Sequence, residues 1–162
     1  MSILHKYSNL EDLGDRGMIK LCAMMDVAQL LAQRLSTCKR ARCGCVVVTT
    51  DFSRMLAVGY NGCAAGLPND SCTSIQGSCM CYHAESNAIK KMLDDDLTAK
   101  WVGCILCCTT SPCLRCAREI VASKLIADVV FSTPYRESNG IAALKVSGIR
   151  IWHLSQGVLS QC

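Results

Sequence analysis

Aromatic residues, proline and long apolar runs are all scarce in this sequence. Aromatic residues make up 5% of the 162 residues and only three residues are proline. No stretch reaches the roughly 18 consecutive apolar residues that a membrane-spanning helix needs. The opening MSILHKYSNL lacks the basic and then apolar pattern of a secretory signal. These absences predict a soluble, cytoplasmic protein with no membrane partner.

The sequence also lacks a large excess of positive or negative charge. The net charge is +4, and the longest basic run is CKRAR at 38–42. Proteins that bind single-stranded nucleic acid usually line a groove with basic and aromatic side chains. The composition therefore indicates that no nucleic acid is required, and it is compatible with a small anionic ligand.

The composition and the hydrophobic pattern predict one globular α/β domain over residues 1–162. Apolar residues make up 51% of the chain and charged residues 19%, which is typical of a protein with a packed core. Helical and strand periodicities alternate, and the first two strands are expected to form a hairpin. The predicted fold is a three-layer α/β/α sandwich with a central five-stranded mixed sheet. The expected helices cover 17–36, 83–93, 112–123 and 139–147, and the expected strands cover 43–50, 55–62, 104–110, 127–132 and 149–154.

Cysteine is the residue present in excess, with 14 copies. Thiols stay reduced in the cytosol, so we expect metal ligands and buried apolar side chains rather than disulfides. The positions within expected helices and strands are predicted to be buried: Cys22, Cys104, Cys107 and Cys108.

Two short motifs predict a metal site. TSPCLRCAREI at 110–120 places Cys113 and Cys116 three residues apart, on one face of a helix. Pro112 is favoured at the first helical position, so both thiols should lie in the opening turn, where the helix dipole stabilises thiolates. In CYHAESNAI at 81–89, His83 stands where another helix should begin. Two thiolates and one imidazole make a zinc site with a fourth position open to water, which is typical of catalysis.

Glu85 lies two residues after His83 and is predicted to be the acid and base. Its carboxylate can take a proton from a water molecule and pass it to a leaving group, which is hydrolytic chemistry at a C–N bond. Alternatively, PCxxC could belong to a structural zinc ribbon or a redox pair, and HxE is common by chance. The presence of both motifs, each opening a helix, favours the catalytic interpretation.

These motifs resemble those of the cytidine and deoxycytidylate deaminase superfamily. GYNG at 59–62, AAGLPND, HAESNAI and VVFSTPYRESNG look like its deoxycytidylate deaminase branch. The resemblance implies a cytidine deaminase-like fold in which His83, Cys113 and Cys116 hold zinc while Glu85 transfers protons. It also implies that Asn61 reaches the sugar, that Tyr135 packs near the nucleotide, and that the chain forms a homo-oligomer.

Other substrate contacts are predicted with alternatives left open. Asn61 could instead be only a turn residue. Ala84 is expected to contact substrate, and Ser111 is expected to cap the cysteine helix or meet the base. Arg42 and Arg136 are candidate partners for a phosphate, although each could simply be a solvated surface residue.

The resemblance suggests a second metal site as well. Some phage deoxycytidylate deaminases carry a second, structural zinc with ligands in the corresponding regions. Four cysteines of this chain could form such a site: Cys38, Cys72, Cys79 and Cys81.

The predicted function is hydrolytic deamination of a cytosine mononucleotide, with dCMP converted to dUMP and ammonia. A tRNA or single-stranded nucleic-acid deaminase is the alternative within the enzyme class. A zinc-stabilised binding module without catalysis is the alternative outside it. Zinc-dependent release of ammonia would separate an enzyme from a binding module.

Overall fold

The structure, a computed structural model, describes residues 10–75, 79–94 and 101–162. Helices and strands alternate along most of this chain. In chain order the elements are the 3-10 helix η2 (Leu10–Asp12), α1 (Gly14–Leu35), β1 (Gly44–Val48), β2 (Met55–Tyr60), β3 (Gly62–Cys63), β4 (Cys81–Tyr82), α2 (Ala84–Leu93), β5 (Cys104–Thr110), α3 (Leu114–Ser123), β6 (Ile126–Thr133), α4 (Asn139–Val146), β7 (Arg150–Ser155) and β8 (Val158–Gln161).

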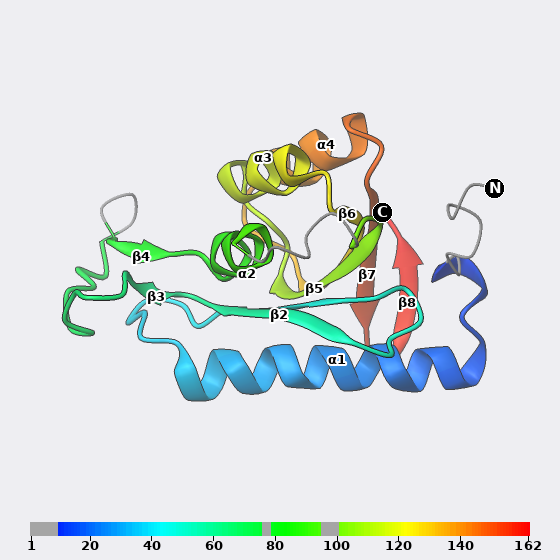
Figure 1. The fold of residues 1–162 in the computed structure, drawn as a ribbon, viewed down its shortest axis with the longest axis horizontal. Coiled ribbons are helices and arrows are strands. Elements are labelled where there is room, and N and C mark those ends of the chain that lie inside the picture. Colours follow the sequence, from blue (N-terminus) through cyan, green and yellow to red (C-terminus); the bar gives the residue numbers. More distant parts are fainter. Residues whose placement is uncertain (1–9, 76–78, 95–100) are drawn as a thin grey trace.

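A six-stranded sheet forms the middle layer, with strand order β2-β1-β5-β6-β7-β8. The β1–β2 hairpin is antiparallel, whereas β5, β6 and β7 run parallel to one another. Figure 1 shows α1 lying along one face of the sheet, with α2, α3 and α4 on the other. The predicted three-layer α/β/α class with a mixed sheet is therefore confirmed.

Alternating strand residues fill two separate cores. On β1, Cys45 and Val47 pack against the side of α2 and α3, while Val46 and Val48 pack against the side of α1. Successive side chains of a strand point to opposite faces, so a strand covered on both sides is apolar throughout. All five residues of β1 are buried accordingly.

The predicted strand number was wrong, because β8 adds a strand at the edge of the sheet. It pairs antiparallel with β7 through a tight turn in which Gln156 and Gly157 both have positive φ, 50° and 78°. Such φ values suit the two-residue turns that match the twist of a hairpin. The sequence VLSQ is short and half polar, so its periodicity gave no strand signal.

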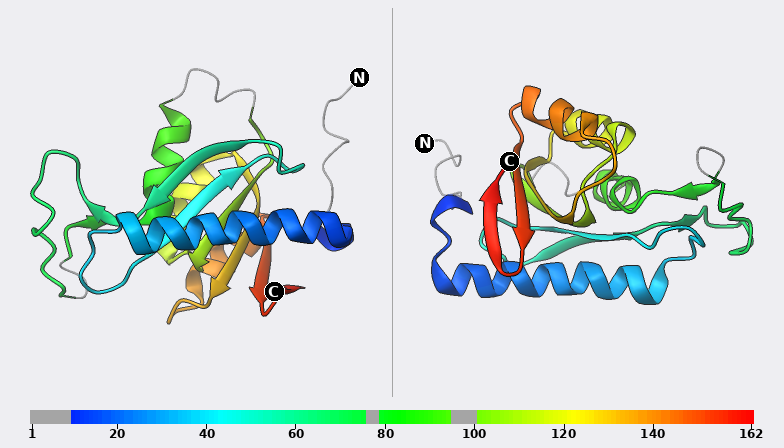
Figure 2. Two further views of the ribbon diagram at one scale, coloured as in Figure 1. Left: turned by 90° about the horizontal axis from the view of Figure 1, so that it is seen from below. Right: turned by 180° about the vertical axis from the view of Figure 1, so that it is seen from behind.

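A second, two-stranded sheet, which was not predicted from the sequence, is formed by β3 and β4. Strands β3 and β4 pair antiparallel, with Gly62 opposite Tyr82 and Cys63 opposite Cys81. Figure 2 shows the segment after β3 projecting beyond the main sheet, next to the C-terminal end of α1. This small sheet brings the end of the β2 region next to the start of α2.

The predicted burial of the strand cysteines is confirmed. Cys104, Cys107 and Cys108 are buried in β5, whereas Cys22 of α1 is only half-buried. Among the described residues, no helix is both long enough and apolar enough to cross a membrane. The single-domain prediction covers residues beyond the described ranges as well, and it stays a prediction.

An ion pair between the buried Asp128 and the half-buried Arg150 joins β6 to β7. Asp128 is 1% exposed, and its carboxylate accepts hydrogen bonds from Arg150 at 2.7 and 2.6 Å and from Trp152 Nε1 at 2.8 Å. Hydrogen bonding to this carboxylate raises the pKa of Arg150. Removal of the carboxylate would leave a buried indole N–H and a half-buried guanidinium without their partner.

We therefore expect Asp128→Ala to lower the free energy of unfolding by about 3 kcal/mol. The matched control is Glu119→Ala, which removes an exposed ion pair with Arg115 on α3 and should cost less than about 0.5 kcal/mol. Urea denaturation of both variants measures the difference. Equal losses in the two variants would contradict the stabilising role of the buried pair.

Candidate active site

The three predicted metal ligands lie at the beginnings of two helices. His83 is the N-cap residue of α2, and Cys113 is the N-cap residue of α3. The prediction that Pro112 is the first helical residue was wrong, because α3 begins at Leu114. The backbone of Cys113 is extended (φ −71°, ψ 169°), and its thiol lies beside that of Cys116 in the first turn.

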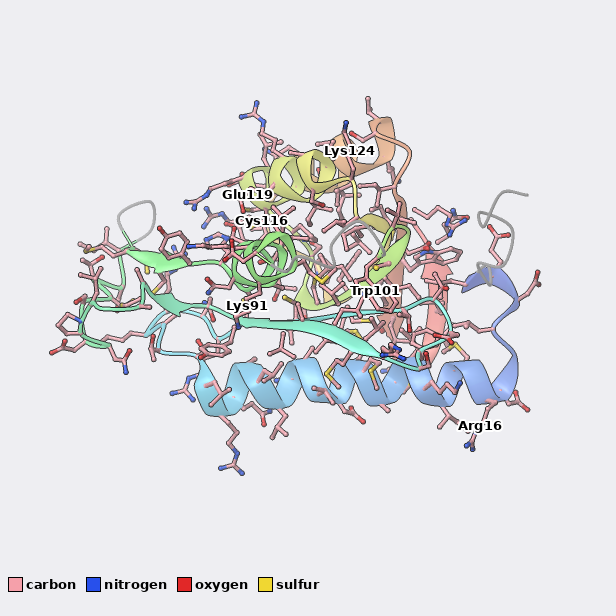
Figure 3. The ribbon with its side chains drawn as sticks, in the orientation of Figure 1. Arg16, Lys91, Trp101, Cys116, Glu119 and Lys124 are labelled. Carbon is pink, nitrogen blue, oxygen red and sulfur yellow. The ribbon has the colours of Figure 1, made fainter. Side chains whose placement is uncertain are left out.

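The donor atoms of these residues lie within coordination distance of a common point. Cys113 Sγ and Cys116 Sγ are 3.6 Å apart, and His83 Nδ1 lies 3.5 and 3.3 Å from them. Tetrahedral zinc, with bonds of about 2.0 Å to nitrogen and 2.3 Å to sulfur, separates its ligand atoms by roughly 3.5 to 3.8 Å. Figure 3 shows Cys116 where α3 faces α2. The arrangement therefore fits a zinc ion.

The pKa values of these three donor groups are shifted by their contacts with one another. The hydrogen bond between Cys113 and Cys116 lowers the pKa of Cys113 to about 3 and raises the pKa of Cys116. The hydrogen bond with Cys113 also raises the pKa of the His83 imidazole. A bound cation would displace these protons, since metal ligands bind in their deprotonated forms.

Glu85 lies one residue inside α2 and is 7% exposed. Its Oε2 is 3.7 Å from Cys116 Sγ. Burial raises the pKa of its carboxyl group. A carboxyl group that sits beside the donors and whose pKa is raised toward neutrality is suited both to accept and to release a proton.

A cavity opens over the donors and gathers most of the predicted substrate contacts. Asn61, Ala84, Ser111 and Tyr135 line it together with Glu85. The remaining lining residues are Arg40, Ala41, Cys43, His83, Thr110 and Cys113.

Ser111 does not cap α3, so that prediction was wrong. Cys113 holds the cap position, and the Ser111 hydroxyl instead accepts a hydrogen bond of 2.7 Å from the backbone N–H of Tyr135. The Ser111 N–H in turn donates to the carbonyl of Thr133 at 2.9 Å. Ser111 therefore holds the segment that carries Tyr135 against the end of β5.

The two predicted arginines lie outside the cavity lining. Arg42 donates to the carbonyl of Gln33 at 2.8 Å. Arg136 pairs with Glu137 at 3.1 Å, and its guanidinium lies 5.2 Å from the ring centre of Tyr135.

Arg40 lines the cavity and was missed by the sequence reasoning. It lies in the CKRAR run that was identified as the longest basic stretch. The sequence signal that could have indicated Arg40 was its position in this basic run, between an expected helix and the first expected strand. Periodicity alone could not tell which arginine of the run faces the cavity.

The second predicted ligand group also comes together. Cys72 Sγ lies 3.9 Å from Cys38 Sγ and 3.3 Å from Cys79 Sγ. The four Sγ atoms of this thiol cluster, from Cys38, Cys72, Cys79 and Cys81, all lie within 4.8 Å of one another. Four thiolates around zinc stand about 3.8 Å apart, so the group fits a closed tetrahedral site.

The pKa values within the thiol cluster also differ. The backbone N–H of Lys39 donates to Cys72 Sγ at 3.4 Å and lowers the pKa of Cys72 to about 6. Burial raises the pKa values of Cys79 and Cys81. Of Cys72, Cys79 and Cys81, Cys72 is therefore the thiol that ionises most readily.

Comparison with known proteins defines the family. The profile of the cytidine and deoxycytidylate deaminase zinc-binding region matches residues 18–133, and the chain belongs to this family. Deoxycytidylate deaminases of Schizosaccharomyces pombe and Saccharomyces cerevisiae are 34% and 35% identical over 140 and 142 residues, which cover 78% and 81% of this chain. The matched regions make up only 41% and 43% of those two proteins.

Solved structures have the same fold. The dCMP deaminase of cyanophage S-TIM5, solved with dCMP and dUMP, has a TM-score of 0.71 and is 33% identical. The similarity covers 81% of this chain and 93% of the phage chain. A Thermotoga maritima diaminohydroxyphosphoribosylaminopyrimidine deaminase/reductase is 23% identical with a TM-score of 0.60, over 84% of this chain and 36% of that one. The latter similarity establishes the fold alone.

Proposed function

We propose that this protein deaminates dCMP hydrolytically to dUMP and ammonia. The observation that carries the proposal is the cavity lined by His83, Cys113 and the buried Glu85, with the thiol of Cys116 lying 3.3 Å from His83 Nδ1 and 3.7 Å from Glu85 Oε2. The relatives named deoxycytidylate deaminase support dCMP as the substrate. A cytoplasmic location and homo-oligomeric assembly stay predictions.

In this mechanism, His83, Cys113 and Cys116 would hold the zinc ion. Zinc in this position would supply Lewis-acid activation of a water molecule. Glu85 accepts a proton from the water that attacks C4 of the base, and it delivers that proton to N3. Glu85 then transfers a proton from the new C4 hydroxyl group to the amino group, which leaves as ammonia. The sum is cytosine plus water giving uracil plus ammonia.

Asn61, Ala84, Ser111 and Tyr135 form the substrate wall in this proposal. The 5′-phosphate is assigned to Arg40, because it is the arginine that lines the cavity. A guanidinium binds phosphate through charge-assisted hydrogen bonds. Arg42 and Arg136, which were predicted from the sequence, are alternatives to be tested beside it.

The thiol cluster is proposed to hold a second, structural zinc. Its four sulfur donors would fill a tetrahedral shell and would leave no position for a water molecule, unlike the three donors near Glu85. Zinc would then link Cys72 and Cys79, which lie between β3 and β4, to Cys38, which follows α1.

Glu85→Gln should retain zinc and the fold while lowering kcat/KM for dCMP by about 100- to 10,000-fold, because proton transfer is lost and no ligand changes. His83→Ala is the contrasting variant and should lose the catalytic zinc. Elemental analysis and an ammonia-release assay measure the two properties separately. Near-normal turnover in Glu85→Gln would contradict the mechanism, whereas no ammonia release by the unaltered zinc-loaded protein would favour the binding-module alternative.

Arg40→Ala should raise KM for dCMP by about tenfold or more, since a charge-assisted phosphate contact is lost. Its activity on deoxycytidine, which has no phosphate, should not change. The unaltered enzyme should rank dCMP above deoxycytidine, with CMP weaker because of its 2′-hydroxyl. The comparison variants Arg42→Ala and Arg136→Ala should change KM less. Activity confined to tRNA or single-stranded DNA would overturn the mononucleotide assignment.

Protein purified without chelator should contain two zinc ions per chain, one for each donor group. Cys72→Ser should remove one of them and leave the other, whereas Cys22→Ser, which alters a half-buried thiol of α1 outside both groups, should remove neither. Elemental analysis provides the count. A value of one that Cys72→Ser does not change would rule out zinc at the thiol cluster.

A further inference from the structure

One short segment borders both the thiol cluster and the cavity. Residues 36–43 connect α1 to β1 without forming a helix or strand. The segment contributes Cys38 to the thiol cluster, and it contributes Arg40, Ala41 and Cys43 to the cavity lining. Its position is therefore set by contacts on both sides.

Asn61 fixes the cavity side of this segment. Its side-chain Oδ1 accepts hydrogen bonds from the N–H of Cys43 at 2.7 Å and from the hydroxyl of Ser36 at 2.6 Å. Its Nδ2 donates to the carbonyl of Ala41 at 2.6 Å. A backbone N–H can only donate and a carbonyl can only accept, so the orientation of the amide is determined.

Ser36 connects this amide to the thiol cluster. Its hydroxyl oxygen accepts a hydrogen bond of 3.3 Å from the backbone N–H of Cys38, while its proton goes to Asn61. Ser36 is buried. A cluster ligand, a buried hydroxyl group and a cavity residue thus form one hydrogen-bonded chain.

The thiol cluster holds the same segment at a second point. The N–H of Lys39, the residue after Cys38, donates to Cys72 Sγ at 3.4 Å. Two consecutive residues of the segment are therefore attached to the cluster directly before Arg40. A shift of Cys38 and Lys39 would move Arg40 and would also draw Ser36 away from Asn61.

We propose that Ser36 is a positioning residue through which metal at the thiol cluster orders the substrate wall of the cavity. Metal bound to Cys38 fixes the position of the segment 36–43. Through its hydrogen bonds to Cys38 and Asn61, Ser36 then also fixes the position of the Asn61 amide. The inference rests on the second metal site and on the dCMP activity proposed above. It adds that the second metal affects KM for the substrate and not only the stability of the fold.

Hydrogen–deuterium exchange tests the coupling without any substrate. Cys79→Ser should remove the cluster metal without altering a contact of the segment, because Cys79 lies against Cys72. The amides of Cys38 and Cys43 should then exchange about tenfold faster or more, as expected when local order is lost. Cys22→Ser is the matched control and should leave both rates unchanged. Unchanged rates in Cys79→Ser, with the cluster metal shown to be lost, would overturn the proposal whatever the substrate is.

Steady-state kinetics tests the role of the hydroxyl group. Ser36→Ala should keep both metals and raise KM for dCMP about threefold to tenfold, the usual effect of one lost hydrogen bond. The value of kcat should stay within about twofold, because Glu85 and its neighbours are untouched. Ser36→Thr, which restores a hydroxyl group, should recover much of the loss. The matched control is Ser123→Ala, which removes a hydroxyl group bonded to the Ile120 carbonyl on α3 and should have no effect.

The double variant separates coupling from two independent structural effects. If Ser36 transmits the effect of the metal, Ser36→Ala combined with Cys79→Ser should raise KM no further than the larger single effect. An increase in KM equal to the product of the two single increases would overturn the proposal. Failure of the dCMP assignment would appear differently, as absence of turnover in the unaltered protein, and the exchange experiment would still decide the coupling.

Discussion

The site depends on the convergence of two helix N-termini on one face of the sheet. His83 and Cys113 both occupy cap positions with extended backbones, so the ligand side chains meet where α2 and α3 begin. Glycine makes the close packing around this point possible. A Cβ atom at Gly59 would overlap the Ala84 carbonyl oxygen, and one at Gly140 would overlap the Pro112 carbonyl oxygen. The positive ends of both helix dipoles are thereby directed at the donor group, where they favour thiolate over thiol.

Environment, rather than residue type, sets how readily individual cysteines of this chain ionise. Burial in the sheet raises the pKa of Cys104 to about 11 and that of Cys107 to about 12, so these thiols behave as small apolar side chains. Hydrogen bonds to sulfur act in the opposite direction at Cys72 and Cys113, whose pKa values fall to about 6 and about 3. The sequence contains the same side chain in each case. The difference between these four thiols comes from burial in the sheet at Cys104 and Cys107 and from hydrogen bonds at Cys72 and Cys113.

The features that the sequence predicted well are local ones. Two cysteines three residues apart at a helix start lie side by side whatever the rest of the fold does, and the apolar strands are long enough to show their periodicity. The missed features depend on tertiary contacts. Strand β8 is a short, largely exposed edge strand that is defined by its pairing with β7. Arg40 and Arg42 have the same local chemistry, and only the path of the segment 36–43 decides that Arg40 lines the cavity.

The cavity is accordingly lined by two kinds of structural element, helix starts and irregular segments. The metal donors and Glu85 stand on helix starts that are packed against the sheet, whereas Arg40, Ala41 and Tyr135 come from irregular segments. Irregular segments tolerate sequence change better than packed elements do, because fewer buried contacts depend on them. An irregular wall must also be held in place, and attachment of the segment 36–43 to the thiol cluster on one side and to Asn61 on the other meets that need.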